Sequence, residues 1–390
     1  MKKILIVNNN MHIGGVQKSL VNLLNEVHMD YDITLFLFDK SGEYLSEIPK
    51  DVNVVACVSA YKYFGISQSE AKQRSIWSFF ARGFLAFITK LLGRSTVVKL
   101  IDLTQRRLPN HYDVAISFLH SGNPNNFYGG CNEFVLNKVN ADKKITVLHG
   151  DYTMCGANSH KNNKLYHKFD LVAACSEGCK NTFIKAMPDM SKQCITLPNC
   201  HNFDKMRADS NVDRMEYSKD RINVLSIGRL GPEKGFDRAL KAVAKAKGKG
   251  IPINYHIVGD GIKRDELNAM SDSLGICDDV VFYGNQSNPY RFLPNADLLL
   301  ISSYHEAAPM VIDEAMCFGV PVLSTNTVSA MDMIVNRGIG WICENSEDGI
   351  SHGLCEILED IISLKEKKKS ILKNAASNDA AVNAFKNAVG

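Results

Sequence analysis

The 390 residues include 45 Lys+Arg and 42 Asp+Glu, a formal net charge of +3, and 45% of them are hydrophobic. This length exceeds what one hydrophobic core usually serves, and the composition is close to the globular average, so we expect two folded domains and exclude a disordered, collagenous or coiled-coil chain. The net charge is too small for a general polyanion binder. No apolar stretch approaches the roughly 20 residues of a membrane span, and the run from Ile4 to Val7 is too short for a signal peptide.

The first half of the chain contains seven short β-branched runs separated by helical segments. They are residues 4–8, 32–38, 53–58, 113–118, 144–149, 170–176 and 194–198. After the first run, Gly14 and Gly15 interrupt the pattern, and residues 16–27 have helical periodicity. Such runs are typical of buried strands in an open parallel α/β sheet.

The pattern then starts again with six further strand-like runs. They are residues 222–228, 254–259, 280–284, 297–302, 321–325 and 340–344. The polar stretch 202–220 is predicted to link the two series. We therefore predict an α/β chain of two doubly wound Rossmann-like domains, residues 1–205 and 206–370, with a C-terminal helix within 371–390. Ligands of such sheets bind at the carboxyl ends of the strands, and two facing sheets would enclose a cleft.

The cysteines indicate a reducing compartment, by default the cytoplasm. There are 11 of them without a Cys-x-x-Cys pair, which argues against a disulfide framework. One group lies close in sequence but with spacings that fit no common zinc site, so buried thiols are favoured and no metal site is predicted: Cys175, Cys179, Cys194, Cys200 and His201.

The first candidate site motif is residues 228–235, Gly-Arg-Leu-Gly-Pro-Glu-Lys-Gly, which follow a predicted strand and open a helix. Arg229 offers a planar guanidinium and Lys234 a mobile point charge, a pairing suited to a diphosphate. Taken singly, each is more commonly a solvated loop charge.

The second candidate motif runs from Glu306 to Glu314, directly after the strand-like run 297–302. Pro309 suits a first helical position, so Glu306 should lie in the loop and Glu314 inside the helix. Free backbone N–H groups at such a helix start form an anion site. The two carboxylates would accept hydrogen bonds from sugar hydroxyls on either side of a phosphate.

Other strand ends carry weaker signals. Gly259 and Gly284 each end a predicted strand where a side chain would block a planar base, although each is also typical of an ordinary turn. Gly14 and Gly15 would let the backbone approach a ligand closely. His149 falls at the end of another predicted strand; a lone histidine is more often structural, but this one lies at the predicted cleft edge.

Along the chain the motifs follow the order Gly14-Gly15, His149, residues 228–235, Val-Gly-Asp-Gly at 258–261, and Glu306 to Glu314 followed by Ala-Met-Cys-Phe-Gly-Val-Pro-Val. In this order they resemble the retaining glycosyltransferases of family four, which have the GT-B fold. The resemblance implies that Arg229 and Lys234 grip the donor diphosphate, that Glu306 lies near the donor sugar's hydroxyls, and that His149 lies near the transferred sugar. The resemblance also implies that six further residues bind the donor, among them Glu314, which would bind the ribose hydroxyls. These residues are Gly14, Gly15, Pro309, Met310, Val311 and Glu314.

The activity that the resemblance implies is that of a retaining, metal-independent hexosyltransferase without a cofactor. A nucleotide-sugar, with UDP favoured, would donate a hexose to a glycan acceptor, favoured as lipid-linked, in cell-surface or capsular polysaccharide synthesis. Ala307 stands where the family usually has glycine, which leaves the donor sugar open. The alternatives are a GDP-mannose-dependent mannosyltransferase, a phosphorylase or epimerase, and a non-catalytic binding protein of the same fold. No Gly-x-Gly-x-x-Gly follows the first strand, which disfavours an oxidoreductase.

Residues 71–110 concentrate positive charge, with eight basic residues against Asp102 alone, or +7. Apolar side chains alternate with the basic ones: Trp77, Phe79, Phe80, Phe84, Phe87, Ile88, Leu91 and Leu92. This composition suits a helix lying on an anionic bilayer, and equally a core helix with a solvated basic face. The first alternative predicts a peripheral protein on the inner face of the cell membrane. Nucleic acid is not an expected partner, because no stacking module accompanies the charge.

Overall fold

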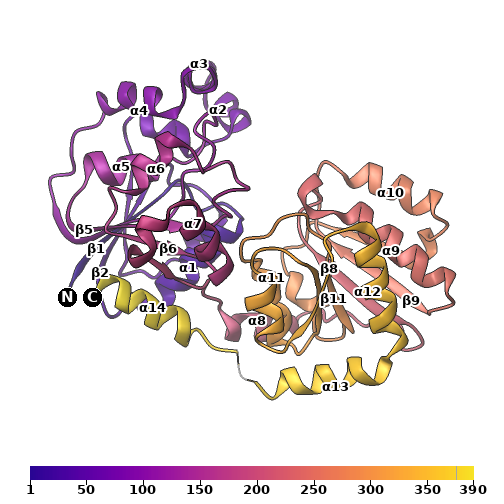
Figure 1. Ribbon diagram of the computed structural model, residues 1–390. Coiled ribbons are helices and arrows are strands. Elements are labelled where there is room, and N and C mark those ends of the chain that lie inside the picture. The colour runs from indigo at the N-terminus through magenta and orange to yellow at the C-terminus, as the bar shows by residue number, and fades with distance from the viewer. Residues whose placement is uncertain (375) are drawn as a thin grey trace. The chain divides into compact units, whose positions relative to one another are not determined.

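The computed structural model describes residues 1–374 and 376–390. The chain forms two compact units, the first of residues 1–201 and 378–390 and the second of residues 202–377 (Figure 1). The sequence-based boundary at 205/206 lies four residues after the division in the structure.

The first unit is built on one parallel seven-stranded sheet in the order β3-β2-β1-β4-β5-β6-β7. Its strands are β1 (Lys3–Asn8), β2 (Asp32–Leu37), β3 (Asn53–Ala56), β4 (His111–Ser117), β5 (Asn140–Leu148), β6 (Leu171–Ala174) and β7 (Cys194–Thr196). Its helices are α1 (Gly15–Val27), α2 (Gln68–Arg74), α3 (Ile76–Leu92), α4 (Arg94–Asp102), α5 (Cys131–Lys138), α6 (His160–Tyr166), α7 (Glu177–Ala186) and α14 (Asp379–Val389).

Both faces of this sheet are buried, which explains the nearly continuous apolar runs in the sequence. Successive residues of β1 point to opposite faces: Ile4 and Ile6 join the core under α1 and α14, whereas Leu5 and Val7 join the core under α4 and α5. Ile4 pairs with Ile33 of β2 on one side and with Val114 of β4 on the other.

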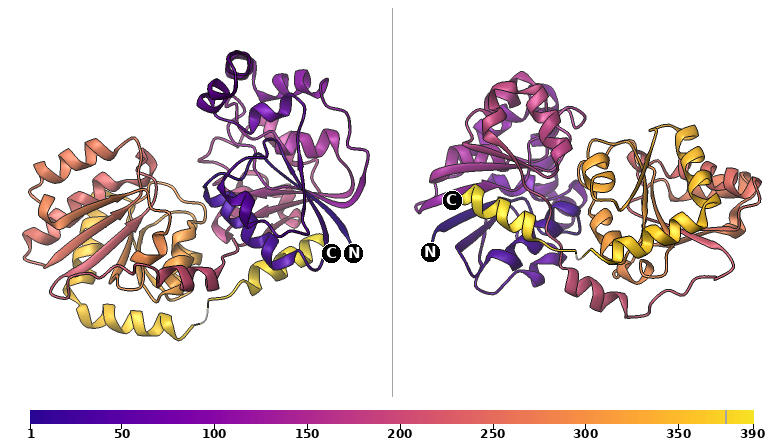
Figure 2. Two further views of the ribbon diagram at one scale, coloured as in Figure 1. Left: turned by 180° about the vertical axis from the view of Figure 1, so that it is seen from behind. Right: turned by 60° about the horizontal axis from the view of Figure 1, so that its bottom comes forward.

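The second unit repeats the architecture with a parallel six-stranded sheet in the order β10-β9-β8-β11-β12-β13. Its strands are β8 (Ile222–Ile227), β9 (Ile253–Val258), β10 (Val280–Gly284), β11 (Leu298–Ile301), β12 (Val322–Thr325) and β13 (Gly340–Cys343). Its helices are α8 (Phe203–Ser210), α9 (Phe236–Gly248), α10 (Arg264–Ser273), α11 (Met310–Cys317), α12 (Glu347–Glu359) and α13 (Ile361–Leu372). Helices α9, α10 and α12 share one core with the sheet, and α8, α11 and α13 share the other (Figure 2).

In each sheet the strand order reverses once, between β1 and β4 in the first unit and between β8 and β11 in the second. Chains leaving two adjacent strands at such a point turn to opposite faces, which opens a crevice at the carboxyl edge. The predicted α/β class with two Rossmann-like domains is confirmed, and so are all thirteen predicted strands, with ends within a few residues of those observed.

The prediction of a linker over 202–220 is wrong in its first part. Residues 203–210 form α8, because Phe203 and Met206 bury their side chains in the second unit's core. Of the predicted terminal segment 371–390, residue 375 lies outside the described residues. Helix α14 begins at Asp379 and packs on the first unit, where the rings of Tyr31 and Phe385 lie 5.9 Å apart between centroids.

The basic segment 71–110 covers the end of α2 and all of α3 and α4, and one arginine of each helix serves the fold. Arg74 donates to both carboxylate oxygens of Asp39. Arg94 is 2% exposed; its Nε donates to Glu133 Oε1 at 2.7 Å and its Nη2 donates to Asn162 Oδ1 at 3.1 Å. Arg82 donates from Nε to the Ile66 carbonyl at 2.7 Å. The available positive charge of this segment is therefore smaller than the sequence count.

A substitution at Gly259 tests how closely β9 packs against β8. A Cβ at this position would lie 1.9 Å from the Gly228 carbonyl oxygen, and its φ of +137° disfavours any side chain. We expect Gly259→Ala to lower the free energy of unfolding by about 2 kcal/mol or more, and thus the melting temperature by about 4–8 °C. Gly248→Ala is the control, because nothing lies within 4 Å of its added Cβ, and it should change stability by less than about 1 kcal/mol. Equal melting temperatures for the two variants would contradict this packing.

Candidate functional site

The loops that follow β8 and β11 meet at the point where the second sheet reverses its strand order (Figure 1). Lys234 Nζ, from the loop after β8, donates to Glu306 Oε1, from the loop after β11, at 2.6 Å. Ser303 Oγ donates to the same oxygen at 2.6 Å. The side chains of Lys234 and Glu306 are 27% and 10% exposed. This partly buried pair therefore joins two of the predicted catalytic residues directly.

Arg238 holds the backbone of the loop after β11. Its guanidinium donates to the Ser302 carbonyl and to Asn345 Oδ1, and lies 3.6 Å from the centroid of the Tyr304 ring. Ser302 Oγ in turn donates to the Lys234 carbonyl at 3.0 Å. The loops that carry Lys234 and Glu306 are thus fixed to each other by backbone contacts as well as by the ion pair.

Arg229 lies at the rim of this region with a 75% exposed side chain. Its Nη2 donates to Glu233 Oε1 at 2.7 Å. Burial would raise the pKa of Glu233, but hydrogen bonds from its own backbone N–H and from Arg229 outweigh burial and hold that pKa below its ordinary value. The guanidinium keeps most of its donors toward solvent, so it is accessible to an anion.

Helix α11 starts at Met310, and Pro309 is its N-cap rather than its first helical residue. A proline has no side-chain oxygen, and the helix start accordingly has no side-chain cap. Glu314 is 4% exposed and faces the interior, one turn into the helix. Asp313, the neighbouring residue, forms an ion pair with Arg337 at 2.7 Å.

A pocket beside the Lys234–Glu306 pair gathers part of the predicted set. Its lining includes Ser226, Lys234, Ser302, Ser303, Glu306 and Val311. Arg229, Glu314, Gly259 and Gly284 do not line it. Gly259 and Gly284 lie side by side at the ends of β9 and β10, where Gly259 N–H donates to the Gly284 carbonyl at 2.9 Å.

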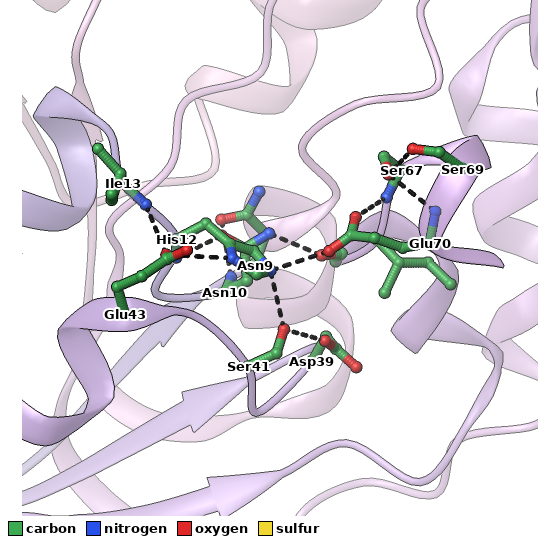
Figure 3. A network of polar contacts seen from close by, with 12 residues as sticks. Asn9, Asn10, His12, Ile13, Asp39, Ser41, Glu43, Ser67, Ser69 and Glu70 are labelled. Atoms are coloured by element: carbon green, nitrogen blue, oxygen red, sulfur yellow. Dashed lines mark hydrogen bonds and ion pairs between the residues drawn. The ribbon is translucent and has the colours of Figure 1, made fainter. Parts of the chain in front are cut away.

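In the first unit, Gly14 and Gly15 form the start of α1, directly after β1. Gly14 is the N-cap, and the helix start has no side-chain cap. A polar network that the sequence did not predict lies beside this loop and centres on His12 (Figure 3). His12 Nδ1 lies 3.3 Å from Glu43 Oε2, and His12 Nε2 lies 3.0 Å from Glu70 Oε1.

Asp39 extends the His12 network to α2. Ser41 Oγ lies 3.1 Å from His12 Nε2 and also donates to Asp39 (Figure 3). Arg74 of α2 grips both oxygens of Asp39 at 2.6 and 2.7 Å. Burial would raise the pKa of Asp39, but the hydrogen bonds from Arg74 and Ser41 lower it below its ordinary value. The loop before Gly14 is thus tied to α2 through charged groups.

His149 follows β5, beside His120 from the end of β4. Burial, together with the neighbouring His120, lowers the pKa of His149 to about 3, and burial lowers that of His120 to about 4. The backbone of Phe118 raises the pKa of His149, but burial outweighs this effect. Among the described residues, the buried Nε2 of His149 has no hydrogen-bond partner, which leaves it open to a hydroxyl.

Sequence reasoning missed His12, His120 and Ser303 as site neighbours. His12 stands two residues before Gly14, and His120 stands two residues after the predicted strand 113–118, so nearness to a strand end was an available signal. The contacts of His12 with Glu43 and Glu70 bridge residues far apart in the chain, and the sequence carries no signal for them.

The cysteine group considered for zinc is buried in the first unit. Cys175, Cys179, Cys194 and Cys200 all lie in its core, and Cys175 Sγ is 4.0 Å from Cys179 Sγ. Within residues 1–374 and 376–390, no group of three or more His, Cys, Asp or Glu side chains could hold a metal ion.

The chain is similar to known proteins in sequence and in fold. Residues 210–378 match the family model of glycosyl transferases group 1. The N-acetylgalactosamine-N,N'-diacetylbacillosaminyl-diphospho-undecaprenol 4-alpha-N-acetylgalactosaminyltransferase of Campylobacter jejuni is 23% identical over 97% of this chain and 95% of its own. The capsular polysaccharide biosynthesis glycosyltransferase CapM of Staphylococcus aureus is 24% identical over 52% of this chain and 55% of its own.

Among solved structures, Anabaena Alr3699/HepE in complex with UDP and glucose has a TM-score of 0.64 at 18% identity, covering 99% of this chain and 95% of its own. This likeness confirms the predicted GT-B fold. The residues that match the glycosyl transferases group 1 model, 210–378, span most of the second unit.

The depressed pKa of His149 predicts an acid-sensitive fold. An unfolded histidine has a pKa of about 6.5, so between that pH and the folded value of about 3 the unfolded state binds more protons. The neutral His149 therefore makes its full contribution to the free energy of unfolding above pH 6.5. Below pH 6.5 this contribution falls, by up to about 1.4 kcal/mol per pH unit if unfolding takes up one proton at His149.

We expect His149→Gln to reduce the loss of unfolding free energy between pH 7 and pH 4.5, measured by denaturant unfolding at several pH values. The control is His352→Gln, because the His352 side chain is 83% exposed. An unchanged pH dependence in His149→Gln would show that the ring is not buried in its neutral form.

Proposed function

We propose that the chain is a retaining hexosyltransferase that moves a hexose from a nucleotide-sugar, favoured as a UDP-sugar, to a lipid-linked glycan in cell-surface or capsular polysaccharide synthesis. The observation that carries the proposal is the Lys234–Glu306 pair at the strand-order reversal of a glycosyltransferase group 1 domain. The similar Campylobacter enzyme is named for a diphospho-undecaprenol substrate, and the Staphylococcus protein for capsular polysaccharide biosynthesis.

The charges support a role at the donor diphosphate. When the bond between the anomeric carbon and the diphosphate oxygen breaks, negative charge develops on the phosphate, and fixed cations and N–H donors aimed there stabilise it. Lys234, Arg229 and the backbone N–H groups of Met310 and Val311 at the start of α11 supply these donors, whereas Pro309 has no N–H and serves as the N-cap of the helix. The new bond forms to an acceptor hydroxyl on the same face of the sugar, and the departing phosphate takes the hydroxyl proton.

The remaining predicted residues bind the neutral parts of the donor. Glu306 accepts hydrogen bonds from sugar hydroxyls once the diphosphate draws Lys234 away from it. Glu314 accepts from the ribose, and Gly259 and Gly284 leave room for the base. In the first unit, Gly14 and Gly15 present backbone N–H groups at the start of α1, and His149 presents Nε2 as an acceptor for a sugar hydroxyl.

The proposal requires neither a metal nor a cofactor, because the cationic side chains and the helix start neutralise the diphosphate. A GDP-mannose-dependent mannosyltransferase of the same fold is the main alternative, since Ala307 leaves the sugar pocket open. A non-catalytic nucleotide-sugar-binding protein is the second alternative, and turnover of a donor in the presence of acceptor distinguishes it.

The donor site is tested by thermal melting with UDP, GDP, ADP and NAD, each with and without EDTA. A ligand at about 100 times its dissociation constant adds about 2.7 kcal/mol. We expect UDP to stabilise the protein equally in EDTA, and Lys234→Ala to weaken UDP binding about 10- to 100-fold through loss of a charge-assisted hydrogen bond.

The matched control is Lys241→Ala, because Lys241 is also ion-paired, to Glu347 at 2.7 Å, but lies on the outer side of α9. It should leave UDP stabilisation unchanged. Stabilisation by NAD alone, or by no nucleotide, would overturn the proposed function, and stabilisation by GDP alone would select the mannosyltransferase.

A further inference from the structure

Helix α3 of the first unit exposes a continuous apolar face. Its five largest outward side chains recur at alternating spacings of three and four residues, which places them on one side of the helix. They are Trp77, Phe80, Phe84, Phe87 and Leu91, which are 80%, 61%, 62%, 60% and 64% exposed. Figure 1 and the left view of Figure 2 show α2 and α3 at the outer margin of the first unit.

The opposite face of α3 already packs on the protein. Leu85 and Ile88 contact the core formed with α4 and α5, and Thr89 is buried. The outward face is therefore not needed to hold the helix in place. A helix that is apolar all round is normally buried, and a contiguous exposed apolar patch usually marks an interaction site.

The surroundings of this face are positively charged. Lys72 of α2, Lys90 of α3 and Lys99 of α4 are exposed. The single acidic residue of 71–110, Asp102, forms its ion pair with Lys138 of α5 at 3.5 Å and not with these lysines. Arg74 and Arg94 add little to this charge, because Arg74 is paired with Asp39 and the buried Arg94 is paired with Glu133.

We propose that the outward face of α3 is a docking surface for an anionic lipid bilayer. The aromatic and leucine side chains insert at the boundary between headgroups and acyl chains, and the three lysines attract the anionic headgroups. A second copy of the chain fits less well, because it would bring two positively charged surfaces together. The proposed function supplies a purpose for docking, since a lipid-linked acceptor is presented at the bilayer, but binding can be tested without turnover.

The protein carries its own probe of this surface. Its two tryptophans are Trp77, at the N-terminal end of the exposed face, and Trp341, which packs against the second unit's core. Trp341→Phe leaves Trp77 as the only tryptophan. We expect its emission to shift to shorter wavelength with phosphatidylglycerol-containing vesicles, and brominated lipids to quench it, with little change on neutral phosphatidylcholine vesicles.

Two variants separate the apolar and the charged contributions. Phe80→Ser, Phe84→Ser and Phe87→Ser together should abolish sedimentation with anionic vesicles. Lys90→Gln with Lys99→Gln should weaken it about 10- to 30-fold and reduce its salt dependence. The matched control changes exposed residues of α13, Ile362→Ser with Lys365→Gln and Lys369→Gln, and should bind as the parent chain does.

Unchanged Trp77 emission with anionic vesicles, or unchanged vesicle binding by the triple serine variant, would overturn the proposal. So would a dimer in solution that the triple serine variant converts to a monomer, because the face would then bind a second copy. Melting with UDP is measured in parallel: its loss while vesicle binding persists contradicts the proposed function alone, and the reverse result contradicts the docking surface alone.

Discussion

The ion pair between Lys234 and Glu306 ties together the two loops on which the second unit's site depends. It exists because the chain turns to opposite faces after β8 and β11, which leaves these loops facing each other at the carboxyl edge. Gly235 is part of the same constraint: a Cβ there would lie 2.3 Å from the Ser302 carbonyl oxygen, and the residue has a φ of +64°. The close approach of the two backbone segments therefore holds the charges of Lys234 and Glu306 near each other.

That pair also suggests how the site changes with its ligand. Without a donor, the carboxylate of Glu306 neutralises the lysine in a partly buried position, where an unpaired charge would be costly. A diphosphate carries more negative charge than one carboxylate, and Arg229 and the start of α11 add donors that only a phosphate can use. The lysine can therefore exchange partners, and Glu306 becomes available to sugar hydroxyls.

The thirteen strands and their division into two series could be predicted from the sequence, because strands buried on both faces leave apolar runs that few other structures produce. The order of the motifs predicted that Lys234 and Glu306 lie at the same edge of the sheet. Their direct contact could not be predicted, because the two residues are 72 positions apart in the chain and only the packing of the two loops brings them together. Arg94 shows the limit most clearly: its charge suggested a surface role, whereas Glu133 and Asn162 hold it in the interior. No local pattern could reveal partners so distant in sequence.

A crystal structure with a bound UDP-hexose tests the central claim most directly. The account predicts diphosphate oxygens at hydrogen-bond distance, about 3 Å, from Lys234 Nζ and from the backbone N–H groups at the start of α11, with Glu306 turned toward the hexose. A donor bound elsewhere on the chain, while Lys234 still contacts Glu306 alone, would contradict it.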